Sequence, residues 1–175
     1  MYKKLPNILT VTRIFMVPIF PLIYFSSLEK ASIYALIFFL FVGATDMLDG
    51  YLARKYNLIS AFGTAMDPLA DKLMLIMVML SFGIKGLLPI WIISFIIIKE
   101  LLMIFTGLYF YFKKEKYVIA SNIFGKSATM FLFLTILGLL WAPEMKIFVY
   151  FVYIAVIMKI VAFVSYAVTH RKNTN

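Results

Sequence analysis

The sequence lacks cysteine altogether and has a single histidine among its 175 residues. No disulfide framework can therefore form, and cysteine usage gives no indication of the redox compartment. The histidine, His170, follows the last apolar segment and is expected to be a solvated interface residue rather than a ligand. Internal repeats, low-complexity tracts and linkers are also missing, which predicts one domain over residues 1–175.

Charged residues are scarce as well, at 14% of the chain against about 25% in a typical soluble domain. Hydrophobic residues make up 64% and the mean hydropathy is +0.99, as expected of an integral membrane protein. A net charge of +9 can indicate nucleic-acid binding, but here Lys and Arg occur in short clusters between apolar runs. Such clusters are typical of topology signals and of attraction to anionic lipids, so no nucleic acid is expected as a partner.

Six apolar segments are long enough to cross a membrane, since a spanning helix needs about 20 residues. The predicted spans cover residues 8–27, 32–53, 66–84, 88–112, 123–141 and 146–168, with short connections between them. The predicted fold is therefore all-α, a polytopic membrane protein with six transmembrane helices.

The orientation follows from the basic residues, which gather at the two ends of the chain and after the second and fourth spans. The opposite side has only Lys30, Lys85 and Lys146. The positive-inside rule therefore predicts that both termini are cytoplasmic. The basic residues on the predicted cytoplasmic side are Lys3, Lys4, Arg54, Lys55, Lys113, Lys114, Lys116, Arg171 and Lys172.

Half of the eight acidic residues lie within 26 positions, as Asp46, Asp49, Asp67 and Asp71. Helical residues three or four apart share a face, so each pair projects from one side of its helix. A short connection makes the two helices neighbours, which brings the four carboxylates together at the cytoplasmic membrane surface. Four unpaired charges would repel, whereas two divalent cations would balance them. Oxygen ligands suit Mg²⁺ or Mn²⁺, so the sequence predicts a two-metal site of the type used in phosphoryl chemistry.

The residues next to the aspartates fit such a site. Gly50 and Ala53 leave room for a ligand, and Arg54 can form a bidentate pair with a phosphate. A lone aspartate at a helix end is commonly only solvated. Four of them, paired at helical spacing on adjacent segments, favour a functional site.

The whole stretch reads D-x2-D-G-x2-A-R-x8-G-x3-D-x3-D and resembles the signature of the CDP-alcohol phosphatidyltransferase family. A P-N-x-x-T-x-x-R segment near the N-terminus and a later G-K-x-x-T segment extend the resemblance to most of the chain, as one membrane domain. The matching residues are Asp46, Asp49, Gly50, Ala53, Arg54, Gly63, Asp67 and Asp71, then Pro6, Asn7, Thr10 and Arg13, and then Gly125, Lys126 and Thr129.

The resemblance implies that a CDP-linked lipid donates its phosphatidyl group to an alcohol while CMP leaves. It implies that Asp46, Asp49 and Asp67 bind the metals, and that Asp71 contacts the second metal and acts as the general base. It also implies that Gly50, Ala53 and Arg54 face the CDP group. This chemistry is coherent, because metals and an arginine can neutralise the leaving charge and a carboxylate can take the proton of the attacking hydroxyl.

The acceptor is less closely specified. The pattern is most similar to the phosphatidylglycerophosphate synthases, which implies CDP-diacylglycerol as donor and glycerol 3-phosphate as acceptor. Asn7, Arg13, Lys99 and Lys126 are the candidate acceptor-binding residues, although each cation could instead snorkel to the headgroups or pair structurally. Such enzymes commonly have a second lysine where this chain has Ala128, and an arginine at the position of Lys99. The missing cation weakens the case for an acceptor that bears a phosphate. The alternative is therefore a cardiolipin synthase of the same family, with phosphatidylglycerol as acceptor.

Two classes of membrane protein outside the family could also place aspartates on helices. Prenyltransferases with paired aspartates need more helices and place their motifs far apart in sequence. A divalent-cation transporter would place its carboxylates near the bilayer midplane, whereas the four aspartates here are expected at the cytoplasmic membrane surface.

The expected setting is a bacterial cell membrane, with the site at the cytoplasmic face and membrane lipids around it. The resemblance also implies that the chain can form a homodimer, although the sequence does not indicate which helix face forms the dimer interface.

Overall fold

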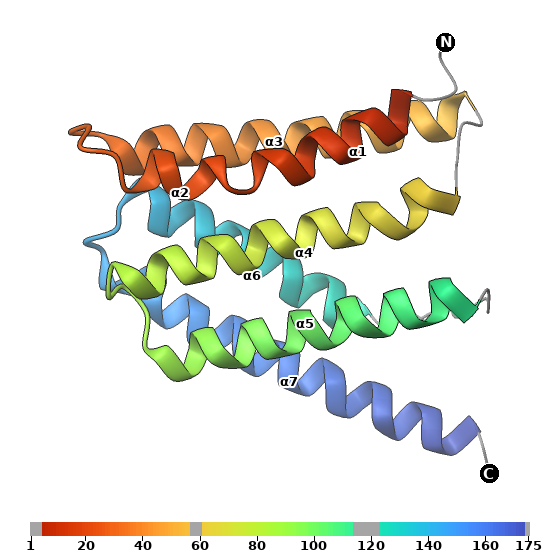
Figure 1. Cartoon of the computed structure of the whole chain (residues 1–175). Coiled ribbons are helices and arrows are strands. Elements are labelled where there is room, and N and C mark those ends of the chain that lie inside the picture. Colours follow the sequence, from red (N-terminus) through yellow and green to blue (C-terminus); the bar gives the residue numbers. More distant parts are fainter. Residues whose placement is uncertain (1–4, 57–60, 114–122, 174–175) are drawn as a thin grey trace. The chain divides into compact units, whose positions relative to one another are not determined.

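In the computed structural model of the chain, the described residues are 5–56, 61–113 and 123–173, and they form helices without any strand (Figure 1). This confirms the predicted all-α class. The seven helices are α1 Leu5–Met16, α2 Ile19–Tyr24, α3 Ala31–Lys55, α4 Ala61–Ile84, α5 Ile90–Lys113, α6 Ile123–Trp141 and α7 Lys146–Asn173.

The first predicted span is divided into α1 and α2, whereas each of the other five corresponds to one helix. Pro18 explains the break, because proline has no N–H to donate and its ring clashes with the preceding turn of a helix. Backbone hydrogen bonds close the turn. The Val17 N–H donates to the Arg13 carbonyl at 3.2 Å, and the Phe20 N–H donates to the Val17 carbonyl at 3.3 Å.

The chain forms two compact units, Met1–Lys116 and Tyr117–Asn175. In the first unit α1 packs against both α3 and α4, α2 packs against α3, and α5 packs against α4. The buried centre of this unit includes the rings of Phe20, Tyr24 and Phe82, and the Tyr24 and Phe82 ring centroids are 5.9 Å apart in an edge-on arrangement. This packing sets α4 between α1 and α5, which decides what the aspartates of α4 can reach. A single domain over the whole chain stays a prediction.

The second unit is an α6–α7 pair joined by a short turn. Gly138 of α6 lies against the ring of Phe148 on α7, so a side chain at position 138 would collide with that ring. Small residues at such points let two helices approach closely. The pair therefore depends on a glycine in the interior of a helix.

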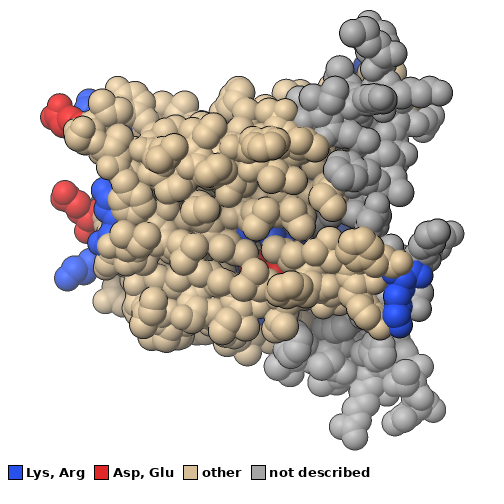
Figure 2. All heavy atoms as spheres, in the orientation of Figure 1, with Lys and Arg blue, Asp and Glu red and all other residues tan. Residues whose placement is uncertain are grey.

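The surface along the helices is mainly apolar, and charged side chains gather at helix ends on the face drawn in Figure 2. Within the described part of the chain, one helix is both long and apolar enough to cross a membrane, Ala31–Leu52. The segments Thr10–Tyr24 and Gly125–Trp141 are apolar but shorter. The count of six spans and the cytoplasmic position of both termini stay predictions.

Candidate active site

Three helices of the first unit meet at a cluster of one arginine and two aspartates. Arg13 of α1 is buried, with 3% of its side chain exposed, whereas the side chains of Asp46 on α3 and Asp71 on α4 are 34% and 53% exposed. Arg13 Nη1 forms an ion pair with Asp46 Oδ1 and donates a hydrogen bond to Asp71 Oδ1 at 3.2 Å. Two of the four predicted aspartates therefore face the same positively charged nitrogen from different helices.

The other two aspartates lie on the same helices. Asp49 follows Asp46 by one turn on α3, and Asp67 precedes Asp71 by one turn on α4. The side chains of Asp49 and Asp67 lie outside the described part of the structure, as do those of Asn7, Ala53 and Arg54. Gly50 lies in α3 and is partly exposed. The convergence of all four carboxylates and the roles of these neighbouring residues stay predictions.

The described donors have the chemistry that a divalent metal needs. No group of three or more Asp, Glu, His or Cys side chains occurs among the described residues, but these include only Asp46 and Asp71 of the four predicted ligands. Those two present carboxylate oxygens from two helices that both pack against α1, both directed at one cationic atom and both partly exposed. Hard cations such as Mg²⁺ and Mn²⁺ prefer such oxygen ligands. The residues present therefore fit a divalent metal ion.

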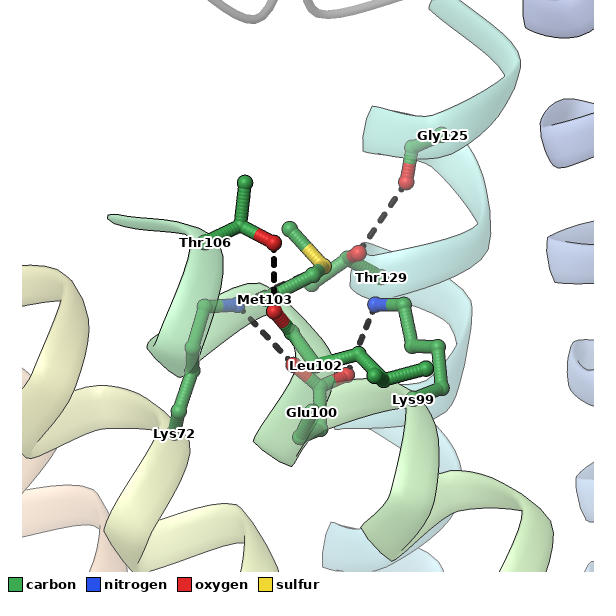
Figure 3. Close-up of polar contacts among 8 residues, drawn as sticks. All are labelled: Lys72, Lys99, Glu100, Leu102, Met103, Thr106, Gly125 and Thr129. Atoms are coloured by element: carbon green, nitrogen blue, oxygen red, sulfur yellow. Dashed lines mark hydrogen bonds and ion pairs between the residues drawn. The ribbon is translucent and has the colours of Figure 1, made fainter. Parts of the chain in front are cut away.

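A second charged cluster, next to the first along α4, joins α4 to α5 (Figure 3). The buried carboxylate of Glu100 accepts a hydrogen bond from Lys72 Nζ at 2.9 Å and another from Lys99 Nζ at 2.8 Å. The exposed fractions of the three side chains are 3% for Glu100, 19% for Lys72 and 34% for Lys99. Lys72 Nζ also lies 3.8 Å from Met103 Sδ. One carboxylate thus holds two ammonium groups in place.

Consecutive residues of α4 therefore bind opposite neighbours. Asp71 contacts Arg13 of α1, and Lys72 contacts Glu100 of α5. Neighbouring side chains on a helix point in different directions, so this division follows from helix geometry. The sequence identified Lys99 as a candidate but assigned no role to Lys72. No local sequence pattern indicates a role for Lys72, because its partner Glu100 is 28 positions away and is brought close only by the packing of α4 against α5.

Lys126 belongs to the second unit, near the start of α6, and its side chain is exposed. It borders a surface hollow of about 460 Å³ that is otherwise lined by apolar side chains and one serine. Its predicted role in acceptor binding stays a prediction. The lining residues are Lys126, Ser127, Met130, Phe131, Leu134 and Met158.

Comparison with known proteins decides the family. The sequence profile named CDP-alcohol phosphatidyltransferase matches residues 3–166, which is nearly the whole chain. The chain belongs to the CDP-alcohol phosphatidyltransferase family. The resemblance inferred from the aspartate stretch is thereby confirmed, and the match extends across both compact units.

Curated relatives carry two different names. A CDP-diacylglycerol–glycerol-3-phosphate 3-phosphatidyltransferase of Bacillus subtilis is 35% identical over 138 residues, covering 72% of this chain and 70% of its own. A protein of the same name from Haemophilus influenzae is 32% identical, covering 93% and 91%. A cardiolipin synthase (CMP-forming)/mitochondrial hydrolase fusion protein of Schizosaccharomyces pombe is 37% identical over 109 residues, covering 62% of this chain. The matched part is only 18% of the length of that fusion protein.

Proposed function

We propose that this chain transfers the phosphatidyl group of CDP-diacylglycerol to glycerol 3-phosphate, which releases CMP and forms phosphatidylglycerophosphate. The observation that carries the proposal is that Asp46 of α3 and Asp71 of α4, two residues of the family signature, both contact Nη1 of Arg13. The relatives named for this reaction that align over most of their length support the same acceptor. Family membership favours a transferase over a cation transporter.

Two divalent cations, Mg²⁺ or Mn²⁺, are proposed to be held by Asp46, Asp49, Asp67 and Asp71. When bound, they would neutralise the charge that develops on the pyrophosphate oxygens. Asp46 and Asp71 support this assignment, because their carboxylates are exposed enough to accept ligands and come from different helices. Arg54, with Gly50 and Ala53 beside it, would bind the CDP group.

Asp71 is proposed to act as the general base. Its side chain is 53% exposed, so an acceptor hydroxyl can approach it. The hydroxyl oxygen would bond to the phosphorus that carries diacylglycerol, the P–O bond to the CMP phosphate would break, and the proton would pass to the Asp71 carboxylate. A general base contributes roughly 10²–10⁴-fold to such a step.

The acceptor phosphate is proposed to bind at Lys99 and Lys72, with Asn7 as a further contact, while acceptor binding by Lys126 of the second unit stays a separate prediction. Lys72 and Lys99 carry two positive charges and Glu100 carries one negative charge, so the cluster keeps a net charge of +1 for an anionic ligand. Lys72 also directly follows the proposed base. Related enzymes commonly have a lysine where this chain has Ala128, and Lys72 provides another cation in this chain. This favours an acceptor that bears a phosphate.

The second candidate is a cardiolipin synthase of the same family, with phosphatidylglycerol as acceptor. It is favoured by the relative of that name and by Ala128, which replaces a lysine.

We further propose an integral protein of a bacterial cell membrane, oriented with the site at the cytoplasmic face, and a homodimer as its assembly. The basic clusters near the predicted cytoplasmic side support this orientation.

An acceptor panel separates the two candidates. Purified protein is incubated with CDP-diacylglycerol, Mg²⁺ and either glycerol 3-phosphate or phosphatidylglycerol, and CMP and the lipid products are identified by mass spectrometry. The proposal predicts phosphatidylglycerophosphate from the first mixture and no cardiolipin from the second. Cardiolipin as the main product would make the second candidate correct, and an absence of CMP from every mixture would contradict the family reaction for this chain.

A further inference from the structure

Arg13 occupies an unusual place for a cation, because it lies between two residues that are proposed to bind metal. The same atom, Nη1, contacts Oδ1 of Asp46 and Oδ1 of Asp71. The arginine is almost fully buried, while both carboxylates are partly exposed. The guanidinium therefore holds Oδ1 of both carboxylates from the protein interior, and an ion that enters from the exposed side would compete for the same two oxygens.

The geometry makes the two cations competitors. Asp46 and Asp71 would hold a divalent ion through their carboxylate oxygens, and Nη1 of Arg13 now engages Oδ1 of both. Nη1 cannot keep both contacts while such an ion is bound. The Asp71 contact is a hydrogen bond of 3.2 Å to the more exposed of the two carboxylates, so it is the contact that metal binding would break first.

We infer that Arg13 is a positioning residue that acts as an internal counter-ion for the metal site. Without metal, it holds Asp46 and Asp71 together and offsets the repulsion between them. When metal binds, Arg13 gives up Asp71 and keeps Asp46. This inference rests on the proposed metal-dependent function, and it gives Arg13 a role different from the acceptor contact suggested by the sequence.

Two effects of replacing Arg13 follow. Arg13→Gln removes a positive charge and a competing donor from the metal site, so the apparent Kd for a divalent ion is expected to fall by roughly tenfold. The metal-free protein is expected to lose thermal stability, because the two carboxylates then lose a cation that contacts both of them. Metal binding is expected to restore much of that loss, so the difference in Tm between variant and wild type narrows as metal is added.

The test is a titration of the full-length protein in detergent with Mn²⁺ and no substrate. Free Mn²⁺ is measured by electron paramagnetic resonance, and Tm is measured at the same concentrations. Arg13→Gln, Arg13→Lys and wild type are compared with Lys30→Gln, which removes one charge from an exposed position before α3. Lys30→Gln is expected to bind Mn²⁺ with the wild-type Kd. The Kd of Arg13→Lys for Mn²⁺ is expected to lie between the values of wild type and Arg13→Gln, because lysine keeps the positive charge but lacks the several N–H donors of arginine.

The outcomes separate this inference from the function on which it rests. Tighter Mn²⁺ binding by Arg13→Gln, with a Tm difference that narrows on adding metal, supports the counter-ion role. If wild type binds Mn²⁺ and Arg13→Gln binds it equally or more weakly, the role is wrong while the metal site stands. If no protein binds Mn²⁺, both the metal site and the inference fail. If Arg13→Gln cannot be purified, Arg13→Lys is compared with wild type instead. Tighter Mn²⁺ binding by Arg13→Lys then supports the counter-ion role, and equal or weaker binding contradicts it.

Discussion

Neutralising Glu100 is expected to loosen the contact between α4 and α5. Glu100→Gln keeps the volume of the side chain but leaves Lys72 and Lys99 facing each other across an uncharged group. Breaking a buried ion pair by removing one partner costs about 3–5 kcal/mol. Glu100 is buried, but its partners are 19% and 34% exposed and can be partly hydrated, which places the expected loss near the lower end. We expect about 3 kcal/mol, or roughly a hundredfold in the ratio of folded to unfolded protein.

The assay is unfolding of the purified protein in mixed micelles with a rising fraction of SDS, followed by intrinsic fluorescence. Glu29→Gln is the matched control, because it makes the same chemical change at an exposed position in the α2–α3 connection. Glu100→Gln should also raise the KM for glycerol 3-phosphate more than the KM for CDP-diacylglycerol, since Lys99 and Lys72 lose their common anchor. Unfolding midpoints that coincide for Glu100→Gln, Glu29→Gln and wild type would refute the reasoning.

Three further predictions concern the chemistry. Asp71→Asn should lower turnover by about 10²–10⁴-fold or more while the protein still inserts and folds, as measured by CMP release and by Tm; turnover near the wild-type rate would remove Asp71 as the base. EDTA should abolish activity, and added Mg²⁺ or Mn²⁺ should restore it; rates that do not respond to chelation would contradict the metal site. Lys126→Ala should raise the KM for the acceptor far more than for CDP-diacylglycerol in steady-state kinetics; an effect on the donor alone would make the acceptor assignment of Lys126 wrong.

Much of the fold follows from the sequence, because long apolar runs and short polar connections mark the helices. The differences occur where polarity and helix formation do not coincide. The helix α4 begins at Ala61, before the apolar run that predicted it, and α7 continues into the basic tail to Asn173. Both extensions are helical but less apolar than the spans. The break at Pro18 was missed because hydropathy alone does not register the lost backbone donor.

The site could be predicted only as far as local spacing reaches. The three- and four-residue spacings of the aspartates indicated shared helix faces, and Asp46 and Asp71 do meet at one point. The partner that joins them, Arg13, lies 58 positions from Asp71, so no local pattern shows the contact. The same holds for Lys72, whose partner Glu100 is on the next helix. Such contacts depend on how α1, α4 and α5 pack, which periodicity does not specify.

The proposed reaction depends on the aspartates of α3 and α4 holding two divalent ions. Anomalous X-ray scattering at the manganese edge, from crystals of the wild-type protein grown with Mn²⁺, tests it most directly. We expect two strong peaks per chain, both within coordination distance of oxygens from Asp46, Asp49, Asp67 and Asp71. Manganese bound elsewhere, or the four carboxylates directed away from one another with no peak between them, would contradict it.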